Sequence, residues 1–188
     1  AGTLKIAGAG SLGTSGTYAG TISNSGNFEY ASSADLTLSG VISGTGSLTK
    51  SGASTLTLGA VNTYTGATTI NGGTLTFSNT GKIYHSASGN GLLASLTINT
   101  GAVLDVKSWD WAGSLGLLTF DASNITINGG TVRQSGSSAN AGAGTNTSSR
   151  QYTIGASGAT FDSATSGVTW TIDRDSRSGY QLATSGNV

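Results

Sequence analysis

A six-residue turn motif recurs along the chain and limits what it can fold into. Ile-Asn-Gly-Gly-Thr-Leu at 70–75 returns as Ile-Asn-Thr-Gly-Ala-Val at 98–103 and as Ile-Asn-Gly-Gly-Thr-Val at 127–132. The spacings are 28 (98 − 70) and 29 (127 − 98), and a looser copy at 152–161 places its Ile at 154, with a spacing of 27 (154 − 127). A motif repeated at such spacings is typical of a solenoid, in which each coil buries its apolar residues against neighbouring coils.

Three earlier isoleucines, Ile6, Ile22 and Ile42, each precede a Gly-containing turn and an apolar residue, at spacings of 16 (22 − 6) and 20 (42 − 22). We interpret them as upstream copies of the same pattern, so the coils are expected to be irregular in length. About seven or eight coils at the spacing of paired strands would form a rod ~35 Å long.

Between the turns, apolar residues alternate with Thr, Ser or Asn. Strict alternation predicts strands with one buried face, and no stretch shows a helical period. The sequence therefore predicts an all-β solenoid in which inward Ile, Leu, Val and Phe form continuous columns. Glycines at the corners permit sharp turns with positive φ. The expected strands lie at 34–40, 54–59, 73–78, 95–101 and 124–130.

The length suits one domain, so residues 1–188 are expected to form a single solenoid. Two segments, 79–91 and 133–150, are low in apolar residues and are expected to leave the coils as loops. The segment 162–188 is expected to be a C-terminal coil or edge segment, and it carries the densest charge cluster, at 173–177.

The charge content argues against several classes of partner. Charged residues make up 9% of the chain and the net charge is zero, so no basic stripe is available for nucleic acid. No apolar run is long enough for a membrane span, so we expect no membrane insertion. The chain has no Cys, which excludes disulfides and thiolate metal ligands, and we expect no metal and no cofactor.

The first residues, AGTLKIAGAG, lack a basic segment followed by an apolar stretch. We therefore expect no signal peptide here. If the protein is secreted, this chain is expected to be a processed form or an excised fragment.

Residues 42–75 resemble the autotransporter passenger-associated β-strand repeat. The resemblance is carried by G-S-L-T-K-S-G at 46–52, T-L-T-L at 55–58, N-T-Y-T-G at 62–66 and T-T-I-N-G-G-T-L at 68–75. It implies a right-handed parallel β-helix in a passenger that is secreted across the outer membrane of a Gram-negative bacterium. The family repeat is structural and carries no known catalytic residue, so none is transferred to this chain.

The chain departs from the family pattern at 53–54 and 59–61, and it lacks the membrane barrel expected of a full autotransporter. The resemblance therefore implies either an excised passenger or a repeat reused in another secreted protein.

Candidates for catalysis are sparse, and we expect no enzyme. A Ser-His-Asp triad needs a histidine, and the only one, His85, lies among Gly- and Ser-rich turn residues. No Gly-x-Ser-x-Gly elbow leads into a helix. The carboxylates that could serve a polysaccharide-acting site are Asp105, Asp110, Asp121, Asp162, Asp173 and Asp175.

Two residue pairs are the candidate ligand-binding residues. Asp173 and Asp175 are two apart, so on a strand they share a face and can bind a cation or a sugar. The simpler interpretation is a solvated turn with weak ion pairs. Trp109 and Trp111 have the same spacing. If exposed, they are expected to stack on a sugar or dock a partner, and if buried, to cap the hydrophobic column or cover a loop. Tyr64 is expected to be a packed corner ring.

The sequence leaves three functional hypotheses. The first is a secreted structural module for adhesion, display or self-assembly, whose strand edges pair with copies of itself or with adjoining coils. The second is a carbohydrate-binding or polysaccharide-acting β-helix that uses the Trp and Asp pairs, with glycans as partners. The third is ice binding by Thr-x-Thr pairs at 55–57 and 74–76, although the irregular spacings do not promise that these pairs stack in register.

Overall fold

Parallel strands form the framework of the part of the chain that the structure describes. The computed structural model describes residues 2–78, 82–83, 95–106, 125–135, 152–163 and 183–184. Every regular element in these ranges is a β-strand, which confirms the predicted all-β fold. Within the same ranges no helix has the length and hydropathy needed to span a membrane.

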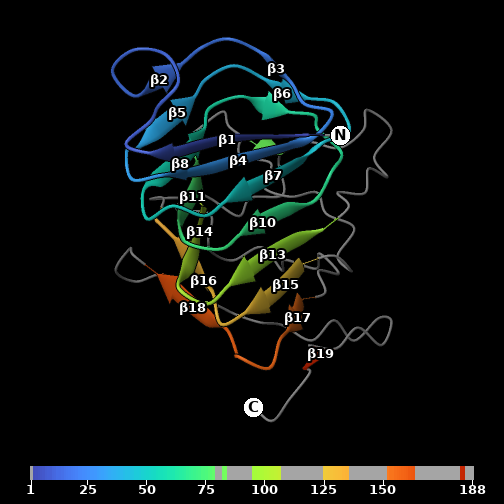
Figure 1. The fold of residues 1–188 in the computed structure, drawn as a ribbon. Helices are drawn as coiled ribbons and strands as arrows, with labels where there is room; N and C mark the ends of the chain where they lie inside the picture. Colours follow the sequence, from blue (N-terminus) through green and yellow to red (C-terminus); the bar gives the residue numbers. More distant parts are fainter. Residues whose placement is uncertain are drawn as a thin grey trace, which may run out of the picture.

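The strands are arranged in two large sheets and a shorter third face (Figure 1). All strand pairs are parallel, and consecutive strands of one sheet are separated in sequence by strands of the other faces, as in a parallel β-helix. The first sheet contains, in spatial order, β1 (Thr3–Gly8), β4 (Asn27–Ser32), β7 (Ser47–Lys50), β10 (Thr68–Ile70), β13 (Leu96–Asn99), β15 (Ile125–Asn128), β17 (Tyr152–Ile154) and β19 (Ala183–Thr184).

The second sheet runs alongside the first, and the third face closes the upstream coils. The second sheet contains β2 (Thr17–Tyr18), β5 (Leu36–Leu38), β8 (Thr55–Leu58), β11 (Gly73–Phe77), β14 (Ala102–Val106), β16 (Thr131–Gln134) and β18 (Thr160–Ser163). The third face consists of two pairs, β3 (Ile22–Ser23) with β6 (Ile42–Ser43), and β9 (Val61–Asn62) with β12 (Lys82–Ile83).

The downstream turn motifs stack as predicted. Ile70 pairs with Ile98, and Ile98 pairs with Ile127, so each interval between two copies of the motif is one coil. Ile127 in turn pairs with Ile154, which places the looser copy in the same column. Alternation within the strands buries this column, since Ile98 and Ile127 have no exposed surface.

Of the upstream isoleucines that were predicted to repeat once per coil, only Ile22 and Ile42 do so. Ile22 and Ile42 do pair, on the third face, but Ile6 pairs with Tyr30 in the first sheet. The interval from Ile6 to Ile22 is therefore wrong as a coil repeat, because these two residues lie on different faces of one coil. Each upstream coil has three strands, so similar turns occur more than once per coil.

Strands occupy part of each of the two segments that were predicted to be loops. The strand β16 continues to Gln134, so the excursion predicted at 133–150 begins after that strand. The pair β9–β12 places residues 82–83 in a strand inside the excursion predicted at 79–91. The rest of these two segments, at 79–81, 84–91 and 136–150, lies outside the described residues.

Candidate functional site

The interior of the stack from β7 to the start of β10 contains polar side chains. In downstream coils the inward positions of the first sheet hold residues such as Ile98 and Ile127. Here four inward side chains, which we call the polar interior, are polar and have no exposed surface: Lys50, Asn62, Tyr64 and Thr68. Because buried polar groups are costly unless they are hydrogen-bonded, their partners determine what this coil can do.

Lys50 ends β7 and points inward, where alternation along Ser47-Leu48-Thr49-Lys50 places it. Its Nζ donates to the carbonyl oxygen of Gly52 in its own turn, and to that of Gly72 in the next coil at 3.3 Å. The ammonium group also lies 5.9 Å from the ring centroid of Tyr30, which belongs to the preceding coil. One side chain therefore contacts three successive coils.

The buried position changes the acidity of this lysine. Desolvation lowers the pKa of Lys50 from 10.5 to about 8, and the nearby carboxylate of Asp35 opposes this shift. Removal of a charge from water disfavours the charged form, whereas an opposite charge favours it. The carboxylate of Asp35 itself accepts a hydrogen bond from the backbone N–H of Thr55 at 2.7 Å.

Gly73 gives the lysine its space. This glycine has φ +63°, and a Cβ there would collide with the carbonyl oxygens of Gly52 and Ser54 and lie 2.7 Å from Lys50 Nζ. The two glycines of the Ile-Asn-Gly-Gly motif therefore have separate roles. Gly72 supplies a carbonyl acceptor, and Gly73 makes the corner without a side chain.

Asn62 bridges two strands of the third face. Its Oδ1 accepts from the backbone N–H of Ile42 at 2.8 Å, and its Nδ2 donates to the carbonyl oxygen of Ala60 at 2.9 Å. The backbone N–H of Thr63 donates to the Ile42 carbonyl oxygen at 2.8 Å. The side-chain amide thus satisfies backbone groups at a place where β6 and β9 are not joined by a regular ladder.

Tyr64 and Thr68 complete the polar interior. The Tyr64 hydroxyl and Thr68 Oγ1 are 2.7 Å apart and share one hydrogen bond. Burial raises the pKa of Tyr64 well above its usual value, although the bond to Thr68 opposes the shift. Tyr64 is a packed corner ring, as expected, and has no surface available to a ligand.

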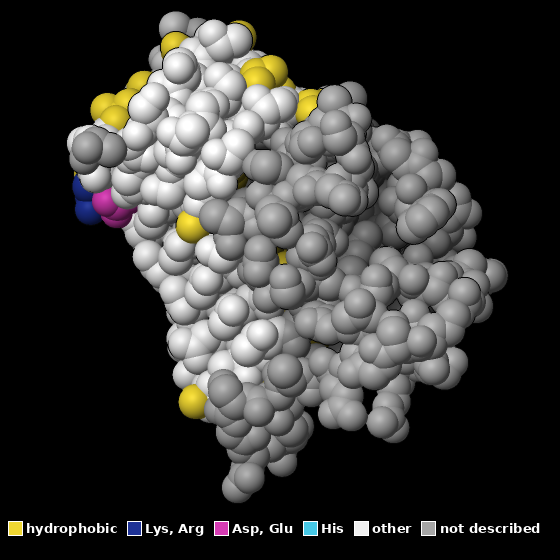
Figure 2. All heavy atoms as spheres, turned by 90° about the vertical axis from the view of Figure 1, so that its right-hand side faces the viewer, with side chains coloured by type: hydrophobic (Ala, Val, Ile, Leu, Met, Phe, Trp, Pro, Cys, Tyr) yellow, Lys and Arg dark blue, Asp and Glu magenta, His cyan; other side chains and the backbone are white. Residues whose placement is uncertain are grey.

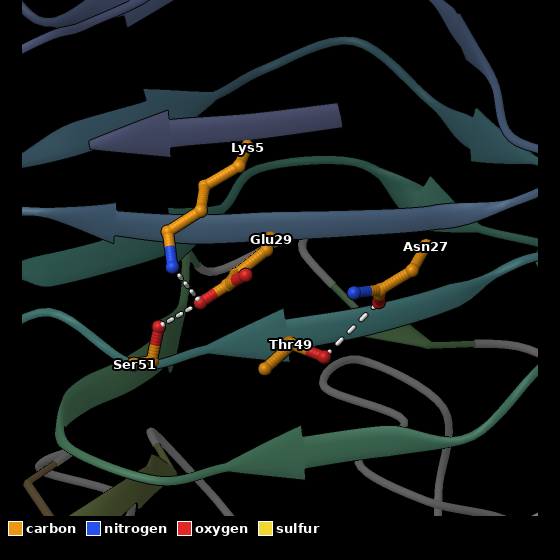
Figure 3. A network of polar contacts seen from close by, with 5 residues as sticks. All are labelled: Lys5, Asn27, Glu29, Thr49 and Ser51. Carbon is orange, nitrogen blue, oxygen red and sulfur yellow. Dashed lines mark hydrogen bonds and ion pairs between the residues drawn. The ribbon is translucent and has the colours of Figure 1, made fainter. Parts of the chain in front are cut away.

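A polar network crosses the outer face of the first sheet over three coils (Figure 3). Lys5 Nζ lies 3.0 Å from Glu29 Oε1, which also accepts from Ser51 Oγ at 2.7 Å. Beside it, Thr49 Oγ1 donates to Asn27 Oδ1 at 3.0 Å. The hydrogen bonds from Ser51 and Lys5 lower the pKa of Glu29. The network links coils on their outside, as Lys50 links them on their inside.

The four predicted ligand-binding residues, Trp109, Trp111, Asp173 and Asp175, lie outside the described residues. The same is true of His85, Asp110 and Asp121. The roles of all seven stay predictions.

Two of the predicted carboxylates are described. Thr76 Oγ1 donates to Asp105 Oδ2 at 3.2 Å across neighbouring coils of the second sheet. Asp162 Oδ2 lies 2.8 Å from Arg133 Nε, in an ion pair whose side chains are 39% and 40% exposed. Both contacts connect successive coils, as expected for structural residues.

The threonine pairs at 55–57 and 74–76 stack in register, which their irregular spacing did not promise. Downstream the array ends, since Thr76 is only 7% exposed and the next coil continues the two positions with Val103 and Asp105. Upstream, the position of Thr57 continues in register with Thr37 and Thr17. The paired pattern therefore covers two coils, and a single column of threonines extends it upstream.

The sequence motif that contains Lys50, at 46–52, does not by itself reveal the role of this lysine. The available signal was its position, since a lysine at an inward place of an alternating strand must be buried. That signal is easily discounted because lysine is almost never fully buried in proteins.

Comparison with known families gives one match, in the part of the chain that contains Lys50. Residues 48–77 match the family described as passenger-associated-transport-repeat, and this range begins two residues before Lys50 and ends with β11. No curated protein and no solved structure matched the chain. This match confirms that residues 48–77 resemble the repeats of autotransporter passengers. The polar interior lies within the matched residues.

Proposed function

We propose that the chain is a structural segment of a secreted passenger, located outside the cell or on its surface, where it forms a rigid support and has no enzymatic role. The observation that supports this most directly is the place of residues 48–77 in the fold. The matched repeat is not a separate unit, since β7 and β10 are interior strands of the first sheet and β8 and β11 of the second. A transport repeat built into a continuous stack suits a support better than a site of chemistry.

Export can be tested with a chain fused to an outer-membrane barrel in a Gram-negative cell. We expect antibody to bind the chain on intact cells, and external protease to remove it. A product that stays inside the envelope although the barrel is inserted would contradict the proposal. A variant that cannot close its corner, Gly73→Val, is the matched control and should reach the surface in a smaller amount.

We further propose that the upstream end of the stack pairs with another strand, either an adjoining coil or a second copy. Leu4 on β1 occupies an inward position and pairs with buried Phe28, yet 55% of its surface is exposed. Hydrophobic side chains are visible at the surface around this end of the molecule (Figure 2). An apolar inward residue on an outermost strand favours pairing.

Sedimentation velocity over a range of concentrations tests this pairing. We expect the isolated chain to self-associate, and Leu4→Lys to weaken the association. Val61 is the other large apolar residue that is exposed among the described residues, at 38%, so Val61→Lys is the control and should leave association unchanged. A clean monomer at high concentration would contradict self-assembly.

A further inference from the structure

One inward column of the first sheet is apolar in nearly every coil. Its members pair in register from each strand to the next, and among the described members of this column Lys50 is the one charged residue. Neighbouring apolar strands of similar length resemble one another, so burial alone discriminates weakly between the correct neighbour and the next one along. The column consists of Ile6, Tyr30, Lys50, Ile70, Ile98, Ile127 and Ile154, and it continues at Thr184 in the last described strand.

We propose that Lys50 selects the coil that stacks on it, so that the coil of β10 and β11 is accepted during folding and the coil that follows it, of β13 and β14, is rejected. A single buried Lys or Asn specifies register in coiled coils in the same way, at some cost in stability. The inference concerns folding in solution and does not depend on whether the protein is exported.

The turn after β10 and the turn after β13 differ in length, so each would place different backbone atoms next to Lys50. In the correct neighbour, Ile70 and Gly73 are separated by two residues, Asn71 and Gly72. In the next coil the paired positions, Ile98 and Ala102, are separated by three residues.

The shorter turn places the Gly72 carbonyl oxygen 3.3 Å from Lys50 Nζ. If β13 paired with β7 instead, the longer turn would lie over the lysine, and the Gly52 oxygen in its own turn would be the only carbonyl acceptor that is kept. A buried ammonium group that loses an acceptor bears a desolvation cost without compensation. The wrong stack is therefore penalised, whereas an apolar residue at position 50 would carry no such penalty.

The chain has no Cys, so a pair of cysteines introduced for spin labels can report the register. Thr49 and Thr97 lie on the outer face of the first sheet, and both pair with Thr69 between them. Their strands are about 10 Å apart in the observed register, and would be about 5 Å apart if β13 paired directly with β7. The full chain is labelled, unfolded in denaturant, refolded by dilution, and measured by dipolar broadening in electron paramagnetic resonance.

We expect the refolded Lys50 protein to give the longer distance alone. Lys50→Met keeps the length of the side chain and removes the charge, and it should add a short-distance population of at least about a tenth of the molecules. Such misassembled repeats are a recognised kinetic trap. Ile127→Met introduces the same residue into the same column and is the control, with the longer distance alone.

Two results would overturn the proposal. A refolded Lys50→Met protein with the longer distance alone would show that the apolar column specifies the register without the charge. A Lys50→Met protein that does not fold, judged by circular dichroism, would show that the lysine supplies stability to the stack and does not select among stacks.

Discussion

The coils upstream of residue 78 differ from those downstream in how they fill their interior. Upstream, paired residues such as Phe28 and Leu48, or Leu48 and Thr68, are 20 apart, whereas downstream Leu96 and Ile125 are 29 apart. The short coils bury polar side chains that bind backbone groups at the corners. The described interior of the long coils is lined by Leu, Ile, Val, Ala and Phe.

In the short coils, inward side chains provide hydrogen bonds to backbone groups at the corners. Several carbonyl oxygens of the upstream corners accept a hydrogen bond from an inward side chain. Asn24 Nδ2 donates to Ser47 at 2.9 Å, and Ser54 Oγ donates to Ser32 at 2.7 Å. Lys50 and Asn62 do the same for other corners. Buried backbone groups require partners, and a tight corner has few others to offer.

Glycine substitutions at one upstream and one downstream corner, Gly73 and Gly101, should give the largest difference in stability. Gly73→Ala is expected to destabilise the chain by about 3 kcal/mol or more, because the Cβ meets backbone oxygens and the residue has positive φ. Gly101, at a downstream corner, has φ +77°, and no atom of the described residues lies within 4 Å of a Cβ there, so Gly101→Ala should cost about 1–2 kcal/mol. Urea unfolding measures both. Equal losses would contradict the view that the upstream corner is tighter.

The second-largest effect is expected in the pH dependence of the free energy of unfolding, to which the buried Lys50 in the upstream interior contributes. The pKa of Lys50 is about 8 in the folded chain and 10.5 ordinarily, so between these values the unfolded chain binds more protons. Stability is then expected to rise with pH from 8 to 10.5, by about 3 kcal/mol, and to be independent of this group below pH 8.

Lys50→Met is the reference for this measurement, because other groups near the lysine, among them Asp35 and Tyr30, remain in place. The difference between the two free energies of unfolding, measured in urea at each pH, isolates the lysine. A difference that stays constant across this window would show that burial does not hold the ammonium pKa down.

Substitution of two asparagines, one in each region, should change the free energy of unfolding by amounts that differ less. Asn62→Leu leaves the Ile42 N–H and the Ala60 carbonyl oxygen without their partner in a buried place, and should cost about 2 kcal/mol. Asn99, on the outer face downstream, donates to Asn71 Oδ1 at 2.7 Å in an exposed bond, so Asn99→Leu should cost about 0.5 kcal/mol or less. Thermal unfolding of the two variants distinguishes them, and a reversed order would remove the proposed role of the upstream amide.

The downstream columns could be predicted from the sequence because each long coil carries one clear turn motif. The spacings of Ile70, Ile98 and Ile127 are therefore coil lengths. Upstream, the three-sided coils repeat similar turns within one coil, and a pattern of Ile followed by Gly does not tell which face it lies on. Ile6 was misassigned for this reason.

The interior of the matched repeat could be predicted only in part. The ring of Tyr64 was expected to pack at a corner, and it does. The role of Lys50 depends on a carbonyl oxygen in the next coil, at Gly72, and no local pattern reveals such a contact. The proposed sugar-binding residues, Trp109 and Asp173 among them, remain predictions because they lie outside the described residues.

The span of Lys50 has a consequence for how the stack comes apart. In a solenoid each coil contacts only its immediate neighbours, so unravelling can proceed from an end one coil at a time. Lys50 contacts Tyr30 in the coil before and Gly72 in the coil after. Under a pulling force, peeling from either end should therefore pause at this point, where three coils are held together by one side chain.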